Sequence, residues 1–200
     1  MAVRIDPATA ARFDDVATIL APKRAGAQGC WCLSYRLPPA QNDALRVPHR
    51  GEELRRLCGR PTHVPGVLTY DGDEVVGWAA IAPRSELGGL GARHFPHDPD
   101  DPWALTCFRV RAGRGRRGVA RALLAGAVAY AADRGAPAVV AYPIDAGGAA
   151  IDRTQASAGL LDWFLDAGFT TVGDTGYQVN GHPRVIVRKQ VDGTGGTLTD

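Results

Sequence analysis

A glycine-rich turn that joins an apolar run to a helical run constrains the fold of this sequence more than any other feature. The run Trp103–Val110 is strand-like, residues 111–117 are rich in Gly and Arg, and residues Gly118–Arg134 are predicted to form a helix. Four apolar residues recur at every fourth position and share one face of that helix, namely Val119, Leu123, Ala127 and Ala131. The pattern predicts a strand whose end leads directly into the start of a helix.

The start of this helix is a predicted anion-binding site. The first turn of a helix offers unpaired N–H groups and the positive end of the helix dipole, and together these bind phosphate. Gly118 lets a ligand approach the backbone closely, and Ala120 keeps the next turn small. Six arginines crowd around this point and would suit a ligand with several phosphates: Arg109, Arg111, Arg114, Arg116, Arg117 and Arg121.

Two common phosphate motifs fit this turn poorly. The P-loop requires a Lys followed by Ser or Thr at the end of the turn, and neither is present here. Gly113, Gly115 and Gly118 do spell the dinucleotide motif G-x-G-x-x-G. That motif belongs at the first strand of a doubly wound sheet with an acidic residue about 20 residues on, whereas here it follows a hairpin and Asp145 lies about 27 residues away.

The remaining elements indicate one α/β (or α+β) domain over residues 1–191, followed by a disordered tail at 192–200. Asp6 is predicted to cap a first helix that has Pro7 in its first turn. Two long loops are predicted at residues 23–42 and 83–102, and the other predicted elements are strands at Val3–Ile5, Gly66–Tyr70, Glu74–Ala82, Ala138–Ile144, Thr170–Val172 and Arg184–Arg188 and helices at Glu52–Cys58 and Leu160–Ala167.

Composition excludes several classes of protein. The chain has 200 residues, 45% of them hydrophobic, and its 23 Lys+Arg against 21 Asp+Glu leave a net charge of +2. These values argue against disorder and against a broad surface for a polyanion such as nucleic acid. The sequence shows no signal peptide and no run of roughly 18 apolar residues, so no membrane partner is expected. Four cysteines in a domain this large are not a disulfide framework, which favours the cytoplasm.

The sequence resembles the GNAT N-acetyltransferases. In that family a strand is followed by the pattern Gln/Arg-x-x-Gly-x-Gly/Ala at the start of a helix, which binds the pyrophosphate of coenzyme A. Residues 115–120 (Gly-Arg-Arg-Gly-Val-Ala) match the second and third positions of the pattern but have Gly115 at the first, so Arg114 is the candidate for that contact. Residues Leu161–Phe169 also resemble the family's late helix that ends in Gly-Phe, and the order of elements follows the family over nearly the whole chain.

The resemblance implies a central mixed, mostly antiparallel sheet that is splayed between two central strands and flanked by helices. The splayed strands would be Trp103–Val110 and Ala138–Ile144, with the pantetheine arm of acetyl-CoA in the gap between them. The residues that the resemblance assigns to cofactor binding are Phe108, Arg109, Val110, Arg114, Gly115, Arg116, Arg117, Gly118, Val119, Ala120 and Arg121.

The resemblance also implies the activity. An N-acetyltransferase moves the acetyl group of acetyl-CoA to a primary amine, which attacks the thioester directly in a ternary complex. The expected acceptor is a small molecule, either a metabolite or an antibiotic. The alternatives are a protein or peptide N-acetyltransferase and a non-catalytic acyl-CoA-binding regulatory domain. The family needs no metal, and the chain is expected to be a monomer or a homodimer.

The acid and base of the reaction are not fixed by the resemblance. The family's usual acid is a Tyr four residues before the Gly of Gly-Phe, but this sequence has Phe164 there, which cannot donate a proton. Tyr142, Cys107 or a water are the candidate replacements, with Tyr142 first because it lies on a splayed strand. Glu86 and Asp145 are candidate bases, and each is also explained as a solvated loop carboxylate.

The segment Cys30-Trp31-Cys32 is a candidate wall of the acceptor site. In the resembled family the chain between the first two helices overlies the acceptor, and an aromatic residue flanked by thiols would shape a pocket there. The other interpretation is a core plug that anchors the long loop. Cys58 and His63 downstream raise the possibility of zinc, but the spacing matches no standard zinc pattern, so no metal is expected.

Overall fold

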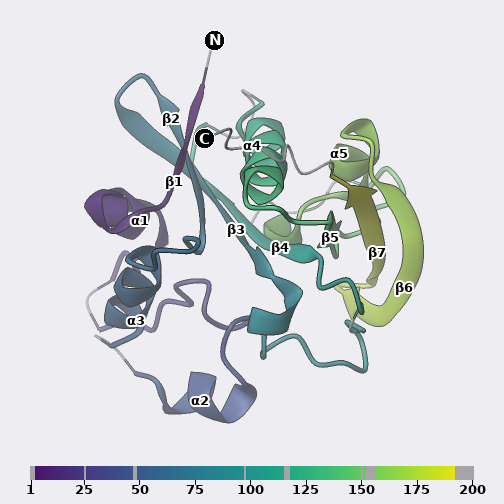
Figure 1. Ribbon diagram of the computed structural model, residues 1–200, viewed down its shortest axis with the longest axis horizontal. Coiled ribbons are helices and arrows are strands. Elements are labelled where there is room, and N and C mark those ends of the chain that lie inside the picture. Colours follow the sequence, from purple (N-terminus) through teal and green to yellow (C-terminus); the bar gives the residue numbers. More distant parts are fainter. Residues whose placement is uncertain are drawn as a thin grey trace, which may run out of the picture.

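The computed structural model describes residues 3–24, 26–46, 49–96, 98–114, 118–149, 151 and 156–191. Its centre is a seven-stranded sheet in the order β1-β2-β3-β4-β5-β7-β6 (Figure 1). The strands are β1 (Arg4–Pro7), β2 (Gly66–Asp71), β3 (Glu74–Pro83), β4 (Trp103–Val110), β5 (Ala138–Ala141), β6 (Thr170–Val179) and β7 (His182–Gln190). All neighbours pair antiparallel except β4 and β5, so the predicted mixed, mostly antiparallel α/β fold is confirmed.

Five α-helices and three 3₁₀ turns are described. The helices are α1 (Phe13–Leu20), α2 (Pro39–Ala44), α3 (His49–Cys58), α4 (Val119–Asp133) and α5 (Leu161–Asp166), and the 3₁₀ turns are η1 (Ala10–Arg12), η2 (Arg84–Glu86) and η3 (Ala156–Ala158). Within the described ranges, no helix combines the length and the apolar character that crossing a membrane requires. The predicted tail at 192–200 lies outside the described residues.

The first predicted helix boundary is wrong. Asp6 and Pro7 belong to β1, where they pair with Leu68 and Val67 of β2, and α1 begins only at Phe13. Proline lacks an N–H group and is tolerated in an edge strand as well as in the first turn of a helix. The Asp-Pro pair is therefore compatible locally with either a helix start or an edge strand, and pairing with β2 selects the strand.

Other element lengths also differ from the predictions. β6 and β7 are longer than the predicted strands, since the side chains of β6 are mostly exposed and show no apolar alternation to read. The run predicted as a strand to Ile144 ends as β5 at Ala141, and only Ile144 makes further bridges. The helix α2 starts inside the predicted loop at residues 23–42, and α5 is one residue shorter at each end than predicted.

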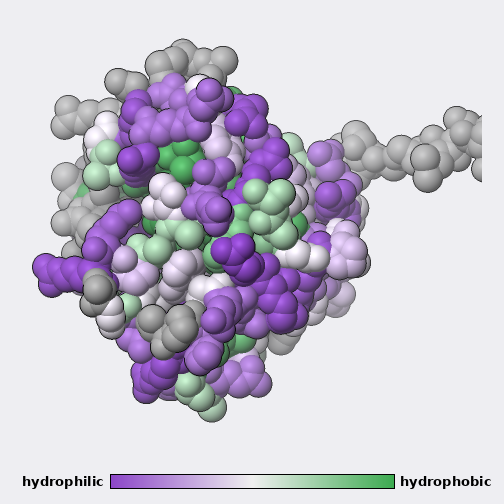
Figure 2. All heavy atoms as spheres, turned by 90° about the vertical axis from the view of Figure 1, so that its left-hand side faces the viewer, coloured by the Kyte–Doolittle hydropathy of each residue, from purple (hydrophilic) through white to green (hydrophobic). Residues whose placement is uncertain are grey.

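Helices cover both faces of the sheet (Figure 1). On one face, which we call the α4 face, Leu123 and Leu124 pack into the cluster that contains Leu105 and Phe108 of β4. On the opposite face, the α1 face, α1 and α3 bury Phe13 and Leu54 among others against Trp78 and Cys107. Seen from its own side, the α1 face is mostly hydrophilic with small apolar areas between the polar side chains (Figure 2).

A buried arginine holds together the loop that precedes α3. The Arg50 side chain is 6% exposed and donates five hydrogen bonds of 2.8–3.2 Å. Four go to the backbone oxygens of Gly29, Cys30, Asn42 and Leu45, and the fifth goes to the Asn42 side chain. A chain without regular structure must satisfy its backbone carbonyls in some other way, and the five donors of a guanidinium do so here.

Two further loops are fastened in the same way. Arg36 donates to the carbonyls of Pro65 and Ile81 at 2.6 and 3.2 Å, and burial lowers the pKa of this guanidinium to about 10. Arg84 donates to the carbonyls of Leu87, Leu90 and Phe95 inside the loop that follows β3. The loops on the α1 face are thus organised by internal cations.

The two long loops also touch each other through backbone. The Gly89 N–H donates to the Tyr35 carbonyl at 3.0 Å. A Cβ atom at Gly89 would lie 2.1 Å from the Ser34 carbonyl oxygen, a distance that no side chain can occupy. Glycine is therefore required where the loop after β3 crosses the loop after α1.

We predict that Arg50→Lys lowers the free energy of unfolding by about 2–4 kcal/mol, because an ammonium cannot reach all the carbonyls that the guanidinium fork satisfies. The measurement is urea denaturation followed by tryptophan fluorescence. Arg55→Lys is the matched control. Because the Arg55 side chain is 58% exposed, this substitution should change the free energy of unfolding by less than about 0.5 kcal/mol. Equal stability of the two variants would contradict the role given to Arg50.

Candidate active site

The sheet opens between its two parallel strands. Pairing between β4 and β5 covers only Trp103–Leu105 opposite Val139–Ala141. β4 then continues to Val110 along β3, while the chain after β5 turns away. From residue 106 onward, β4 pairs with no described strand on the side of β5. This is the splay that the resemblance implies.

The far wall of the opening comes from the segment before α5. Ile144 bridges Leu160 on one side and Arg184 of β7 on the other, and its N–H donates to the Gly159 carbonyl at 3.0 Å. Gly159 has φ +83°, and a Cβ there would lie 3.2 Å from the Phe108 ring of β4. The opening is thus bounded by β4 on one side and by residues 158–160 on the other.

The start of α4 lies just beyond the end of β4. Gly118 is the N-cap with φ +73°, and the Ala122 N–H donates to its carbonyl at 3.0 Å. The N–H groups of Val119, Ala120 and Arg121 come before Ala122, the first residue whose N–H has an acceptor within the helix, so they have no partner there. Among the described residues, no atom outside the adjoining chain lies within 4 Å of where a Cβ at Gly118 would stand, which leaves room for a ligand on this side of the helix start. These features fit a pyrophosphate; Gly115, Arg116 and Arg117 lie outside the described residues.

Most of the described arginines around this turn are already neutralised. Three of them pair with carboxylates: Arg111 with Glu74, Arg114 with Asp71 and Glu74, and Arg121 with Asp166. Arg114, the candidate for the first position of the motif, is therefore held by the β2–β3 hairpin. Within the described part of the chain, Arg109 has no carboxylate within ion-pair distance.

A cavity of about 360 Å³ lies on the α1 face beside β4. The segment Cys30–Cys32 lines it together with Cys107 and Arg109, as the acceptor-site hypothesis requires. Trp31 and Cys32 have φ values of 50° and 53°, a left-handed conformation that is strained for both residue types. Trp31 stacks on Phe13 with ring centroids 6.2 Å apart.

The segment Cys30–Cys32 is predicted to form either a wall of the acceptor site or a plug in the core, and different residues of it take these two positions. Cys32 is buried and accepts a hydrogen bond from the Trp78 indole at 3.2 Å, so it anchors the loop in the core. Cys30 is exposed and faces the cavity. Strain is retained in a folded chain only where the surroundings hold it, and such residues concentrate at functional sites.

Cys32 and Cys107 are two buried thiols that interact with each other on the α1 face. This interaction and burial raise the pKa of Cys32, whereas the same interaction, together with the charge and the hydrogen bonding of Arg109, lowers the pKa of Cys107. Negative charge is thus favoured on Cys107. The effect of Arg109 also shows that its guanidinium lies close to the thiols on the α1 face.

Comparison with known proteins decides the family. The sequence model of the acetyltransferase (GNAT) family matches residues 34–152, which is more than half of the chain. The chain belongs to the GNAT acetyltransferase family. Members of this family are enzymes that transfer acetyl groups, and they use acetyl-CoA.

Solved GNAT structures share the fold at low identity. The histone acetyltransferase HPA2 and related acetyltransferase from Corynebacterium glutamicum is 21% identical with a TM-score of 0.56, and the match covers 96% of this chain and 97% of that one. The ribosomal-protein-S18-alanine N-acetyltransferase from Escherichia coli is 11% identical with a TM-score of 0.54 and full coverage of both chains. An aminoglycoside 6'-acetyltransferase type Ii is 16% identical with a TM-score of 0.53, covering 95% of this chain and 97% of that one. No curated protein matches the sequence.

Tyr142, the first candidate for the GNAT acid, is buried at the end of β5. Its ring packs edge-on against Phe95 with centroids 4.7 Å apart, and burial raises the pKa of its hydroxyl. Alternation along the strand places Tyr142 on the α1 face, in a second cavity of about 320 Å³ that Arg84 also lines. Phe164 is fully buried against Phe108 on the α4 face.

The candidate bases are engaged elsewhere. Glu86 pairs with Arg60 at 2.6 Å and with His63 at 3.0 Å, below the loop that follows β3. Asp145 accepts a hydrogen bond from the Gly147 N–H at 3.0 Å. Neither carboxylate lines the cavity beside Cys107. Neither lines the cavity beside Tyr142 either, so the structure does not bring Glu86 and Asp145 together with Tyr142.

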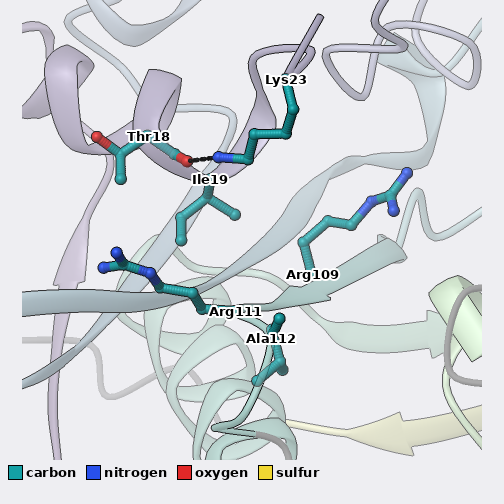
Figure 3. Close-up of a pocket in the computed structure, with 7 residues that line it drawn as sticks. Thr18, Ile19, Lys23, Arg109, Arg111 and Ala112 are labelled. Atoms are coloured by element: carbon teal, nitrogen blue, oxygen red, sulfur yellow. Dashed lines mark hydrogen bonds between the residues drawn. The ribbon is translucent and has the colours of Figure 1, made fainter.

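Residues at the end of α1 complete the α1 face and were missed from the sequence. A cavity of about 400 Å³ lies between Thr18, Ile19 and Lys23 and the end of β4 (Figure 3). The Lys23 ammonium donates to the Thr18 carbonyl at 3.1 Å, while the Arg109 side chain extends from β4 (Figure 3). No local motif marks Lys23, because only the topology brings α1 to β4. Over the described ranges, no three His, Cys, Asp or Glu side chains gather as a metal site would need.

We predict that Gly118→Glu weakens acetyl-CoA binding by at least about 100-fold, because a carboxylate would stand at the anion site. Isothermal titration calorimetry measures the affinity, and thermal unfolding checks the fold. Gly118→Ala is the matched control: it carries the same left-handed strain of about 1 kcal/mol without the charge. An unchanged affinity in Gly118→Glu would remove this helix start from the site.

Proposed function

We propose that the protein is an acetyl-CoA-dependent N-acetyltransferase that acts on the primary amine of a small molecule. The observation that carries the proposal is the opening between β4 and β5 beside the start of α4, which no described residue covers at Gly118. A helix N-terminus at the end of an unpaired strand edge suits a ligand that has phosphates at one end and an extended amide chain at the other.

The proposed roles follow from the two faces of the sheet. The N–H groups of Val119, Ala120 and Arg121 hold the pyrophosphate, and the free edge of β4 at Phe108–Val110 orients the pantetheine arm through backbone hydrogen bonds. Acetyl-CoA supplies the activated acetyl thioester. The cavity beside Cys107 on the α1 face admits the amine from the other side. The amine attacks the thioester directly, and Cys30, Trp31 and Cys32 enclose it.

Tyr142 is the proposed proton donor for the departing thiolate. It lies directly after the last residue of β5 that pairs with β4, on the α1 face. Because burial raises the pKa of its hydroxyl, Tyr142 stays protonated through the physiological range. Glu86 and Asp145 remain candidates for the base only through an intervening water, since each is already bound to another group.

A small acceptor is favoured over a protein. The cavity is about 360 Å³, which is in the range of small-molecule sites, and the strained segment at Cys30–Cys32 closes part of it. The names of similar proteins do not agree on an acceptor, since they include a ribosomal protein and an aminoglycoside. The alternative of a peptide acceptor follows from the family alone, whereas that of a non-catalytic acyl-CoA sensor rests on Phe164 at the position of the family's usual Tyr.

A thiol-release assay tests the proposal. Purified protein is incubated with acetyl-CoA and a panel of primary amines, and free coenzyme A is measured with a thiol reagent. Acetylation of a small amine is the expected result. Tight binding of acetyl-CoA without turnover on any amine or peptide would favour the regulatory alternative, and turnover on peptides alone would replace the acceptor class.

We predict that Tyr142→Phe lowers kcat by about 100-fold, the size of a lost general acid, and leaves acetyl-CoA affinity unchanged. The phenylalanine ring keeps the packing against Phe95. Because burial raises the pKa above its ordinary value, kcat of the unmodified enzyme should not fall on the alkaline side until above about pH 10. A kcat that does not change in Tyr142→Phe, measured across pH 6–10, would remove Tyr142 from this role.

A further inference from the structure

We propose that the acceptor is a small primary amine that also carries a carboxylate, and that the Arg109 side chain binds that carboxylate. The inference rests on the proposed function and narrows its substrate class. Its basis is the charge of the groove on the α1 face, which the sequence and the family leave open.

The groove is made of the two cavities of about 360 and 400 Å³ on the α1 face. They share Ile19, Lys23 and Arg109 and therefore adjoin along the end of β4. The described residues that line them include cations but no Asp or Glu side chain. A concave site with one sign of charge selects ligands of the opposite sign.

Arg109 is the cation in this groove with a guanidinium left to bind a ligand. Arg111 is paired with Glu74 at 2.6 Å. The Lys23 ammonium donates one hydrogen bond to the Thr18 carbonyl and adds its charge to the groove, but it lacks the planar pair of donors that binds a carboxylate bidentately. Arg109 has no carboxylate partner among the described residues, and its guanidinium lowers the pKa of the Cys107 thiol inside the cavity by its charge and by hydrogen bonding, which leaves its other N–H donors for a ligand. Arginine binds a carboxylate through two parallel hydrogen bonds, which fixes the orientation of the ligand as well as its charge.

Three further arginines are buried on the α1 face outside the groove, where Glu86 acts on Arg36 and Asp98 lines the cavity beside Arg84. Arg36, Arg84 and Arg184 are buried there and donate mainly to carbonyl oxygens. No described carboxylate lies within ion-pair distance of these three side chains. A buried charge is screened less than a surface charge, so the field of these arginines persists at moderate salt. A polycationic acceptor would enter this groove against that field.

The position of Arg109 also fits a short acceptor. Arg109 lies two residues after Cys107 on the same face of β4, about 7 Å along the strand. The opening toward β5 begins just after Leu105. The long Arg109 side chain can span much of this distance, so a short acceptor with its amine at the opening can present its carboxylate to the guanidinium.

The phosphates of coenzyme A are the other source of an anion for Arg109. The test therefore measures cofactor affinity and acceptor preference separately. The probes are the proteinogenic amino acids, each paired with its carboxamide, with kanamycin as a polycationic acceptor. Rates are expressed as kcat/KM for the neutral amine, because amidation lowers the pKa of the amino group.

We expect at least one amino acid to be acetylated more than about tenfold better than its amide, the preference that a charge-assisted bidentate contact provides. Arg109→Gln should reduce this preference to near unity while the acetyl-CoA affinity stays unchanged. Arg111→Gln removes the same charge from a guanidinium that Glu74 already pairs, and its preference should stay within about twofold of the original.

Two outcomes would overturn the inference and leave the proposed function standing. One is efficient acetylation of amides, neutral amines or kanamycin with no preference for a carboxylate. The other is an Arg109→Gln variant that loses acetyl-CoA affinity and treats acids and amides alike, which would assign Arg109 to the cofactor. Failure of acetyl-CoA to bind at all would instead overturn the proposed function.

A binding experiment gives a result without turnover. Saturation-transfer NMR compares N-acetyl amino acids with N-acetyl amino acid amides in the presence of coenzyme A. Preferential binding of the acids that is lost in Arg109→Gln supports the inference. Equal binding of acids and amides, or no binding of either, contradicts it.

Discussion

The bonds between buried guanidinium groups and backbone carbonyls are the interaction on which the α1 face of this enzyme depends. Arg36, Arg50, Arg84 and Arg184 are at most 8% exposed, and each donates to carbonyl oxygens of irregular chain. A lysine has one compact charged group and could not satisfy several carbonyls that point from different directions. The abundance of arginine is therefore part of how long loops without regular structure obtain a fixed shape.

These internal cations also set the electrostatics of the site. A guanidinium that is bound only to carbonyls keeps its full charge inside the molecule, because no carboxylate cancels it. The surface arginines around the start of α4 behave differently, since Glu74, Asp71 and Asp166 neutralise most of those described. The net charge of +2 thus conceals an uneven distribution in which the α1 face is positive from within.

The sequence allowed the central part of the fold to be predicted, because local patterns and tertiary structure agree there. β4 has the predicted bounds, and α4 begins within one residue of its predicted start, since apolar runs, Gly118 and the helical spacing act within a few residues. Asp6 and Pro7 failed as a helix start, because partners far along the chain decided their conformation. The residues of the site also divide into those that local sequence patterns reveal and those that only distant partners bring into place. The turn before α4 was visible in the sequence, whereas the groove between α1 and β4 has no local signature, and the ion pairs that occupy Arg111 and Arg114 depend on a hairpin about 40 residues away.

The crossing of the two long loops at Gly89 bears on how such an enzyme changes its substrate during evolution. Backbone meets backbone there, with no space for even a methyl group, and each loop is fastened separately by its own arginine. An insertion or deletion in either loop would break the backbone contact at Gly89 and disturb the conformation of both loops. Descendants of this chain are therefore expected to diversify by exchanging side chains while the loops keep their lengths, with Cys30 and Trp31 on the loop and Arg109 on β4 as the positions most free to vary.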